Sequence, residues 1–356
     1  MREQESWKQK WMVLSLCVLM FCTSGAWADF TFGEPVNLGA PINTSLGEGT
    51  PMISLDGLSL YYVSEGSGSA DIWVAKRKST EDAWEPGTNL GPIVNSSIVD
   101  SCPFISTDGL TLYFNRIFSI WQTTRPTVDD DWTPPAKLGA PINSSDDDID
   151  PCISANGLEF YFASSRHRPK ADWDLYVCRR ESVQDAWGEP TALGVLNSNS
   201  YDYGPSLSAD GLVMFFNSHR AGGWGQSDVY MTTRSSLDAG WSPPVNIGLP
   251  VNTSYDEYCP RISPDGRTLY FCDNPYYPLR PGGMGGTDIW KASIDPIVDF
   301  NGDGIVDLAD VAILIERWGT DDSVCDIGPM PWGDGILDGH DLLVLVESMV
   351  ETSDQE

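Results

Sequence analysis

An acidic side chain recurs at the same place in five successive segments of this 356-residue chain, three residues before a proline. If that proline opens the innermost strand of each repeat, the five carboxylates converge on one mouth of a central channel. Close carboxylates raise one another's pKa unless a cation or hydrogen-bond donors compensate. Two interpretations stay open: a site for a cation or polyol, or carboxylates that accept hydrogen bonds from loop backbones. The residues are Glu48, Asp100, Asp148, Asp202 and Glu257.

Tyrosines stand beside the acidic position in two of the segments, as Tyr201 and Tyr203 in one and as Tyr255 and Tyr258 in the other. Flat aromatic faces next to carboxylates are typical of a sugar-binding groove, because ring faces stack while hydroxyl groups find acceptors. Packing at the rim of the fold is the alternative interpretation. Tyr203 and Tyr258 therefore join the five carboxylates as candidate ligand contacts.

Familiar catalytic motifs are missing from the sequence, which holds no Gly-x-Ser-x-Gly elbow, no His-Glu-x-x-His pair and no phosphate-binding loop. The three histidines show no paired spacing, so we expect His167 and His219, with the arginines beside them, to be solvated loop residues. A glycosidase needs two carboxyl groups in unlike surroundings, whereas the repeated acid is alike in every segment. No catalytic residue is predicted on this basis.

The elements that position these residues recur about every fifty residues, a period typical of propeller blades. Each repeat begins with a hairpin in which an apolar run enters an Asp-Gly or Asn-Gly turn and an alternating run leaves it. A third alternating run follows, and then a segment with Trp, Pro and Leu-Gly or Ile-Gly, which predicts four strands per repeat. The hairpins span residues 51–62, 103–114, 151–162, 205–216 and 259–271.

The two ends of the array predict how it closes. Residues 32–43 have the pattern of a fourth strand without a blade of its own, and the last repeat stops after Trp290 without a fourth strand. If the N-terminal segment supplies that missing strand, the ring closes and no blade is left open. We therefore expect an all-β fold, a five-bladed β-propeller over residues 29–292.

An asparagine ends each repeat, and most of these asparagines lie in Asn-Thr-Ser or Asn-Ser-Ser triplets that match glycan acceptors. Asn197 keeps the place without the triplet, so a role in the turn explains the whole set better than glycosylation. The other members are Asn43, Asn95, Asn143 and Asn252.

The hairpin pattern Pro-x-Ile-Ser-x-Asp-Gly-x-x-Leu-Tyr-Phe, followed by Asp-Ile-Trp or Asp-Leu-Tyr, resembles the WD40-like repeats of TolB-type propellers. Five in-phase copies cover nearly all of the chain up to residue 292, with Asn156 and Ser119 as local departures. The resemblance implies binding and scaffolding, and it brings no catalytic residue with it.

The formal net charge of -30, from 51 acidic and 21 basic side chains, disfavours nucleic acid or an anionic membrane surface as a partner. Residues 1–28 combine a basic start, an apolar run and a small-residue end, the pattern of a cleaved export signal, so we expect a secreted or periplasmic protein. In that oxidising setting Cys259 and Cys272, which flank one hairpin, form either a disulfide or two buried thiols.

After a short linker, residues 293–298, the segment 299–310 has oxygen donors at positions one, three, five, nine and twelve of a calcium loop, and glycine at position six. A second copy precedes another apolar helical run, and it begins at Asp326 if residues 328–332 are an insertion. The predicted calcium ligands are Asp299, Asn301, Asp303, Ile305, Asp307 and Asp310 in the first loop and Asp326, Asp334, Ile336, Asp338 and Asp341 in the second.

Two such loop-helix units look like a type I dockerin over residues 299–350, followed by an acidic tail at 351–356. The resemblance implies calcium-dependent attachment to a cohesin-like partner, and dockerins usually form part of polysaccharide-degrading enzymes. The main prediction is a secreted, non-catalytic binding or scaffold protein whose propeller recognises a glycan or protein ligand. The alternative is a carbohydrate-active hydrolase, a glycosidase of polysaccharide catabolism, delivered by the dockerin.

Overall fold

The computed structural model describes residues 30–166, 172–273, 280–302, 305–320, 325–327 and 336–353. The described chain forms two compact units, of which the first is Phe30–Asp295 and the second begins at Pro296. No helix in these ranges is long and apolar enough to cross a membrane. The predicted export signal, residues 1–28, lies outside the described residues.

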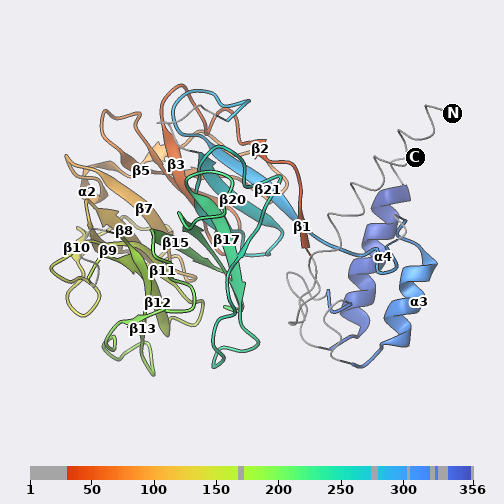
Figure 1. The fold of residues 1–356 in the computed structure, drawn as a ribbon. Helices are drawn as coiled ribbons and strands as arrows, with labels where there is room; N and C mark the ends of the chain where they lie inside the picture. Colours follow the sequence, from red (N-terminus) through yellow and green to blue (C-terminus); the bar gives the residue numbers. More distant parts are fainter. Residues whose placement is uncertain are drawn as a thin grey trace. The chain divides into compact units, whose positions relative to one another are not determined.

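The first unit is a five-bladed β-propeller, as predicted. Five antiparallel sheets stand around a common axis (Figure 1), and the first strand of each hairpin is the innermost strand of its blade. Neighbouring innermost strands contact one another all the way around, and the last of them contacts the first. The ring is therefore closed at its centre.

Each of the first four blades has four strands in simple meander order. Blade 1 contains β3 (Glu48–Ile53), β4 (Ser59–Ser64), β5 (Asp71–Lys76) and β6 (Thr88–Asn89), followed by the short helix α2 (Gly91–Val94). Blade 2 contains β7 (Asp100–Ile105), β8 (Thr111–Arg116), β9 (Ser119–Thr124) and β10 (Ala136–Lys137). Blade 3 contains β11 (Asp148–Ile153), β12 (Glu159–Ser164), β13 (Asp174–Arg179) and β14 (Thr191–Ala192). Blade 4 contains β15 (Asp202–Leu207), β16 (Val213–Ser218), β17 (Asp228–Thr233) and β18 (Val245–Asn246).

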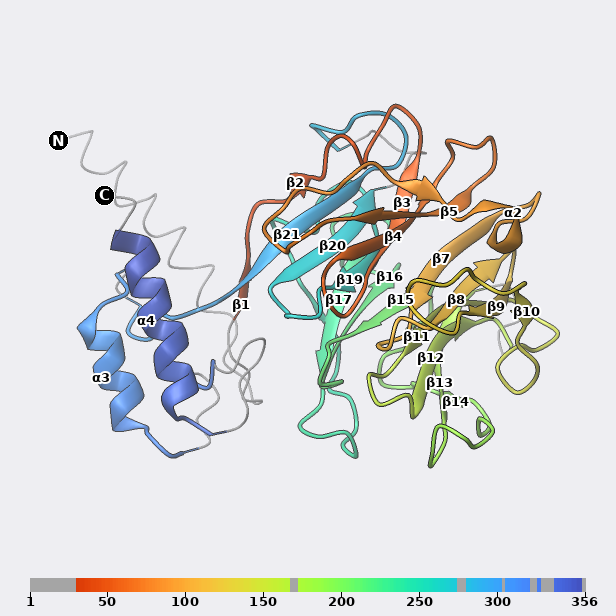
Figure 2. The same ribbon diagram turned by 180° about the vertical axis from the view of Figure 1, so that it is seen from behind.

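Blade 5 joins the two ends of the ring. Its strands β19 (Glu257–Ile262), β20 (Thr268–Asp273) and β21 (Ile289–Pro296) are completed by the N-terminal β1 (Phe30–Phe32) and β2 (Val36–Asn37), which both pair with β21 (Figure 2). Val36 lies opposite Lys291, so the predicted closure by the N-terminal segment is confirmed. Strand β21 runs on to Pro296, and the first residues of the predicted linker are therefore strand.

A bulge that the sequence analysis did not predict interrupts every innermost strand one residue before its proline. The bulged residue has a φ between 48° and 65°, a left-handed conformation that is uncommon for side chains other than glycine. The bulge pairs Cys272 with Tyr258 and leaves Cys259 outside the register, so these two cysteines are free thiols. The five bulged residues are Thr50, Cys102, Asp150, Gly204 and Cys259.

The repeated tryptophan fixes the hairpin turn through an arginine at the end of the third strand. In blade 1 the guanidinium of Arg77 lies 4.4 Å from the ring centre of Trp84, and its Nε donates to the carbonyl oxygen of Gly57 in the turn. The same arrangement recurs in blades 2, 3 and 4. The contact combines a cation–π interaction with a hydrogen bond, and it holds each turn against the outer part of its blade.

The second unit contains two short helices, α3 (Leu308–Glu316) and α4 (Gly339–Ser353). Its small core consists of side chains that are fully buried: Leu314, Cys325, Ile327, Leu337 and Leu345. Asp307 caps the N-terminus of α3 and forms a capping box with Asp310, which stabilises the first turn of the helix.

Candidate functional site

The five repeated carboxylates are fully buried, and each accepts a hydrogen bond from the backbone N–H four residues earlier. In four blades an arginine at the end of the second strand or in the loop after it pairs with the same carboxylate. The ion-pair distances are 2.7 Å for Arg116–Asp100, 2.6 Å for Arg166–Asp148, 2.8 Å for Arg220–Asp202 and 3.3 Å for Arg280–Glu257. This geometry supports the interpretation that the carboxylates order the neighbouring loops. Ligand binding by them stays a prediction.

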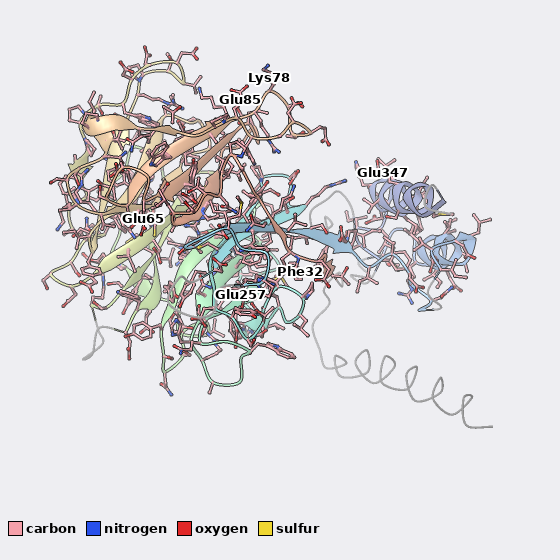
Figure 3. The ribbon with its side chains drawn as sticks, turned by 90° about the horizontal axis from the view of Figure 1, so that it is seen from above. Phe32, Glu65, Lys78, Glu85, Glu257 and Glu347 are labelled. Carbon is pink, nitrogen blue, oxygen red and sulfur yellow. The ribbon has the colours of Figure 1, made fainter. Side chains whose placement is uncertain are left out.

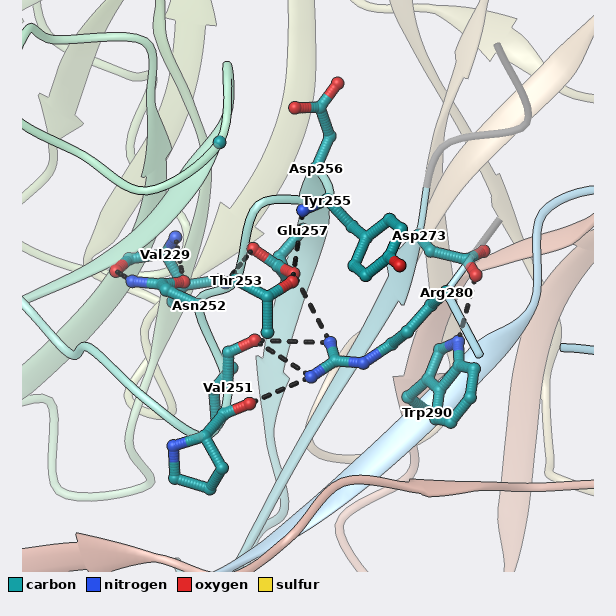
Figure 4. A network of polar contacts seen from close by, with 12 residues as sticks. Val229, Val251, Asn252, Thr253, Tyr255, Asp256, Glu257, Asp273, Arg280 and Trp290 are labelled. Atoms are coloured by element: carbon teal, nitrogen blue, oxygen red, sulfur yellow. Dashed lines mark hydrogen bonds and ion pairs between the residues drawn. The ribbon is translucent and has the colours of Figure 1, made fainter. Parts of the chain in front are cut away.

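Blade 5 shows how one such pair is built (Figure 4). Glu257 accepts hydrogen bonds from Thr253, and Arg280 also donates to the carbonyl oxygens of Pro250 and Val251. Glu257 lies within the body of the ring, whereas Lys78 and Glu85 stand on a peripheral loop (Figure 3). Burial outweighs the hydrogen bonds and the Arg280 charge, and it raises the pKa of Glu257 to about 8.

The bulged position breaks the symmetry of the ring, because Asp150 is the only carboxylate among the five bulged residues. Asp150 is 3% exposed and accepts hydrogen bonds from Asn115 Nδ2 at 3.2 Å and from the backbone N–H of Gly204 at 3.1 Å. The left-handed backbone recurs at this position in every blade, so the carboxylate, and not the strain, distinguishes Asp150. Asp150 therefore presents an oriented carboxylate near the axis of the propeller, in blade 3 only.

An aromatic cluster lies above this carboxylate at the mouth where the innermost strands begin. Tyr203 is its centre, with ring-centre distances of 5.8 Å to Trp173, 5.7 Å to His219 and 6.2 Å to Tyr258. Tyr201 packs against both Trp173 and His219. We call these five residues the aromatic mouth. Four of them are half-buried, and Tyr203 is buried beneath them.

A second carboxylate outside the repeat pattern adjoins the aromatic mouth. Asp256 is buried, accepts the backbone N–H of Gln226 at 2.8 Å and receives the hydroxyl hydrogen bond of Tyr258 at 3.3 Å. Asp150 also lies close enough to Tyr203 to raise its pKa electrostatically. Tyr203 and Tyr258 are thus brought together, and each is close to a buried carboxylate. Their contact with a ligand stays a prediction.

Two polar groups of the aromatic mouth, His219 and Tyr203, are neutral at pH 7. Burial lowers the pKa of His219 despite the charges of Asp256, Asp202 and Asp228, so its imidazole is uncharged. Burial is also the main cause that raises the pKa of Tyr203 well above its usual value. The Tyr203 hydroxyl lies 3.3 Å from His219 Nε2 and 3.3 Å from the Ser227 hydroxyl. The cluster therefore holds groups that can donate or accept a proton next to two carboxylates.

Sequence reasoning missed several members of this site. His219 is half-buried among aromatic rings, and Arg166 and Arg220 form ion pairs with buried carboxylates, so the expectation of solvated loop residues was wrong for these three. His167 and Arg168 lie outside the described residues. Tyr255 makes no ring contact with the aromatic mouth among the described residues and lies beside Arg280 instead (Figure 4). Asp150 could have been found from the sequence as the carboxylate that interrupts an otherwise neutral repeat position.

The first predicted calcium loop closes on a buried carboxylate. Asp310 is fully buried and accepts the backbone N–H groups of Asn301 at 3.2 Å and Asp307 at 2.9 Å, while Asp299 accepts that of Gly302 at 2.8 Å. These oxygen donors are of the kind that calcium prefers. Ile305 also lies in this loop, and Asp303 lies outside the described residues. No three His, Cys, Asp or Glu side chains in the described ranges are grouped closely enough to hold a metal ion.

The second loop repeats this arrangement in part. Asp341 is fully buried and accepts the backbone N–H groups of Asp338 at 2.7 Å and Ile327 at 2.7 Å. Ile327 thus takes the place that Asn301 has in the first loop, and Asp326, which is 7% exposed, comes one residue before it. Ile336 precedes the helix, and Asp334 lies outside the described residues. In the first turn of each helix, therefore, a buried aspartate accepts hydrogen bonds from the backbone of its own loop.

No protein-family model and no curated protein matches this sequence. Among solved structures, the chain is similar to an α-L-arabinofuranosidase from Podospora anserina, with a TM-score of 0.50, 13% identity and coverage of 76% of this chain and 98% of that one. An α-L-arabinofuranosidase from Lactobacillus brevis has a TM-score of 0.50, 15% identity and coverage of 71% and 92%. TolB from Acinetobacter baumannii has a TM-score of 0.43, 15% identity and coverage of 78% and 66%.

These comparisons define the class as a β-propeller and correct the main functional prediction. The sequence favoured a non-catalytic binding or scaffold protein, because TolB-type repeats imply binding and the repeated acid is alike in every blade. The two structures reported above with a TM-score of 0.50 are both enzymes, α-L-arabinofuranosidases. The main prediction is therefore wrong, and the alternative of a carbohydrate-active hydrolase agrees better with the comparisons. The symmetry argument considered only the repeated acids, whereas Asp150 and Asp256 stand outside the repeat.

Proposed function

We propose that the propeller is a carbohydrate-active hydrolase that cleaves glycosidic bonds at the aromatic mouth. Two observations carry this proposal: Asp150 lies near Tyr203 and Asp256 accepts a hydrogen bond from Tyr258, and both carboxylates stand outside the repeat pattern. Glycosidases need two carboxyl groups in unlike environments. Here one carboxylate is held at the axis by Asn115 and the other at the rim by Gln226 and Tyr258.

The aromatic mouth suits a sugar substrate. Tyr258, Tyr201 and Trp173 are half-buried, and their ring faces can stack on the apolar faces of a sugar ring. Neutral Tyr203 and His219 can exchange hydrogen bonds with sugar hydroxyl groups, or they can pass a proton to Asp150 or to Asp256. We assign acid-base chemistry to these two carboxylates, and substrate positioning to the rings around them.

A screen of the purified full-length protein on plant and algal polysaccharides tests the proposal, with release of reducing ends as one readout and retardation in polysaccharide gels as the other. We expect cleavage of at least one polysaccharide and a loss of at least about 10²-fold in rate for Asp150→Asn and for Asp256→Asn. Asp146→Asn, which changes an exposed carboxylate near the start of β11, is the matched control and should keep full activity. Retardation without any release of reducing ends, or unchanged rates in both variants, would refute the assignment.

We also propose that the C-terminal unit is a calcium-dependent docking module of the dockerin type. Two buried aspartates, Asp310 and Asp341, support this proposal, because each accepts hydrogen bonds from backbone N–H groups of its own loop. Bound calcium would add positive charge among the carboxylates of these loops. Asp299, Asn301, Asp307 and Asp310 would hold it in the first loop, together with Asp303 and the backbone oxygen of Ile305.

In this proposal the chain is exported by residues 1–28 and attached to a cohesin-like partner that brings the hydrolase to its polysaccharide. Titration of the full-length protein against a panel of cohesin modules, with calcium and with a chelator, tests the attachment. Binding should appear only with calcium and should disappear in Asp310→Ala. Equal binding with and without the chelator would contradict the proposed mechanism.

A further inference from the structure

A small cavity lies at the other end of the propeller axis, where the innermost strands end. Its volume is about 70 Å³, and every blade contributes an apolar side chain to its wall. It is separate from the aromatic mouth, which lies where the same strands begin. The apolar side chains are Met52, Phe104, Ile153, Leu207 and Ile262.

Among the described residues that line this cavity, Arg261 is the only one with a charged side chain. It occupies the position after the repeated proline, where the other blades have Met52, Phe104, Cys152 and Ser206. Its Nη1 donates to the carbonyl oxygens of Pro205 at 2.8 Å and Pro260 at 3.1 Å, whereas its buried Nε has no hydrogen-bond partner. No bond from its Nη2 is found in the described part of the chain either. One edge of the guanidinium, formed by Nε and Nη2, is therefore unused.

The charge of Arg261 is also uncompensated. The side chain is 3% exposed, and among the described residues no carboxylate lies within ion-pair distance of it. Cys152 is close enough to feel this charge, but burial raises the pKa of its thiol to about 11, so the thiol stays neutral. A buried charge without a counter-ion is costly, and arginine cannot relieve the cost by losing its proton.

We propose that this cavity binds a small monocarboxylate with a short hydrocarbon chain. A carboxylate has the geometry to accept two parallel hydrogen bonds from the free Nε–Nη2 edge, and its single charge matches that of Arg261. The apolar wall would contact the chain and disfavour phosphate or sulfate, whose second charge would have no partner. This site is independent of the proposed hydrolase activity, since no residue is shared between them.

Isothermal titration of the full-length protein with formate, acetate, propionate and butyrate, at constant pH and ionic strength, tests the site. Each added methylene that enters the cavity should tighten binding about fourfold, until the chain outgrows the space. The melting temperature of the propeller should rise in the same order. Chloride, phosphate and the alcohols of matching chain length are the comparison ligands, and all should bind more weakly than butyrate.

Arg261→Met gives blade 5 the methionine that blade 1 has at the equivalent position, Met52, so the variant should fold. It should lose carboxylate binding. Arg261→Lys keeps the charge without the planar edge and should bind at least about tenfold more weakly. Arg267→Met, an exposed arginine in the same hairpin, is the matched control. Retained binding in Arg261→Met, equal binding of butanol and butyrate, or phosphate binding as tight as butyrate would overturn the proposal.

Discussion

The side-chain amide of Asn43 joins the two ends of the propeller by bonding both backbone groups of Ile289. Asn43 Nδ2 donates to the carbonyl oxygen of Ile289 at 2.8 Å, and the N–H of Ile289 donates to Asn43 Oδ1 at 3.0 Å, across 246 residues of sequence. The other repeat asparagines bond the third strand of their own blades in the same way. The predicted turn role of these asparagines is confirmed.

Asn43→Ala should loosen the closure of the ring. The change removes two buried hydrogen bonds and leaves both backbone groups of Ile289 unpaired, so we expect a loss of about 2–4 kcal/mol in the free energy of unfolding. Hydrogen exchange of the amides in β2 should also accelerate. Asn197→Ala removes the equivalent bonds within blade 3 and serves as the control, because it should destabilise the protein without accelerating exchange in β2. Equal exchange in the two variants would contradict a closing role for Asn43.

Glu257 should make the propeller less stable as the pH rises. Its pKa is about 8 in the folded protein, above its ordinary value of 4.5, so the folded state keeps a proton that the unfolded chain releases between these pH values. The free energy of unfolding should therefore fall from pH 4.5 to 8 by more in the native protein than in Glu257→Gln. Denaturant unfolding at several pH values, with the exposed Glu65→Gln as control, measures this difference. The same pH slope in Glu257→Gln and the native protein would argue against the raised pKa.

Glu159 and Arg234 form a buried ion pair at 2.6 Å between blades 3 and 4. Burial alone would raise the pKa of Glu159, but hydrogen bonds from Arg234 and Tyr161 and the nearby positive charges lower it. Glu159→Ala leaves Arg234 buried without its partner and should cost about 3–5 kcal/mol, whereas Glu159→Leu with Arg234→Met together should cost much less. A double-mutant cycle by denaturant unfolding measures the coupling, and additive losses would exclude it.

The lowered pKa of Glu159 also predicts the opposite pH dependence from that of Glu257. Its contribution to stability should be complete above its ordinary pKa of 4.5 and should disappear as the pH falls through the lower folded value. The difference in stability between the native protein and Glu159→Gln should therefore shrink in acid. A difference that stayed constant down to the acid transition would contradict the lowered pKa.

Removal of calcium should unfold the C-terminal unit and spare the propeller. The carboxylates of the two loops repel one another without a cation, whereas the propeller has its own core and its closed ring. Circular dichroism should show a loss of helix with EDTA and recovery with calcium, while the main thermal transition stays in place. Asp310→Ala should behave like the chelated protein, and Glu316→Ala, on the exposed side of α3, should not. Full helix content in EDTA would show that the unit folds without the ion.

The blades could be predicted from the sequence because their signals are local. An Asp-Gly turn, an alternating run and a repeated tryptophan each act within one repeat. Five copies in phase, with an extra strand before the first copy, predict a closed ring of five blades. The pairing of the N-terminal segment with the last blade followed from counting strands, since a ring with a three-stranded last blade needs an outer strand from elsewhere.

The candidate site could not be predicted in this way because it depends on contacts between blades. The sequence marks Asp150 and Asp256 as departures from the repeat, but only the folded ring places Asp150 near Tyr203 of the next blade and Asp256 near His219 of the blade before its own. The folded ring likewise buries Arg261 at the axis without a counter-ion, whereas an isolated strand would leave this side chain exposed to solvent. Local pattern thus determined the number and order of the strands, while closure of the ring decided which side chains meet, because residues about fifty positions apart become neighbours only when the blades pack around one axis.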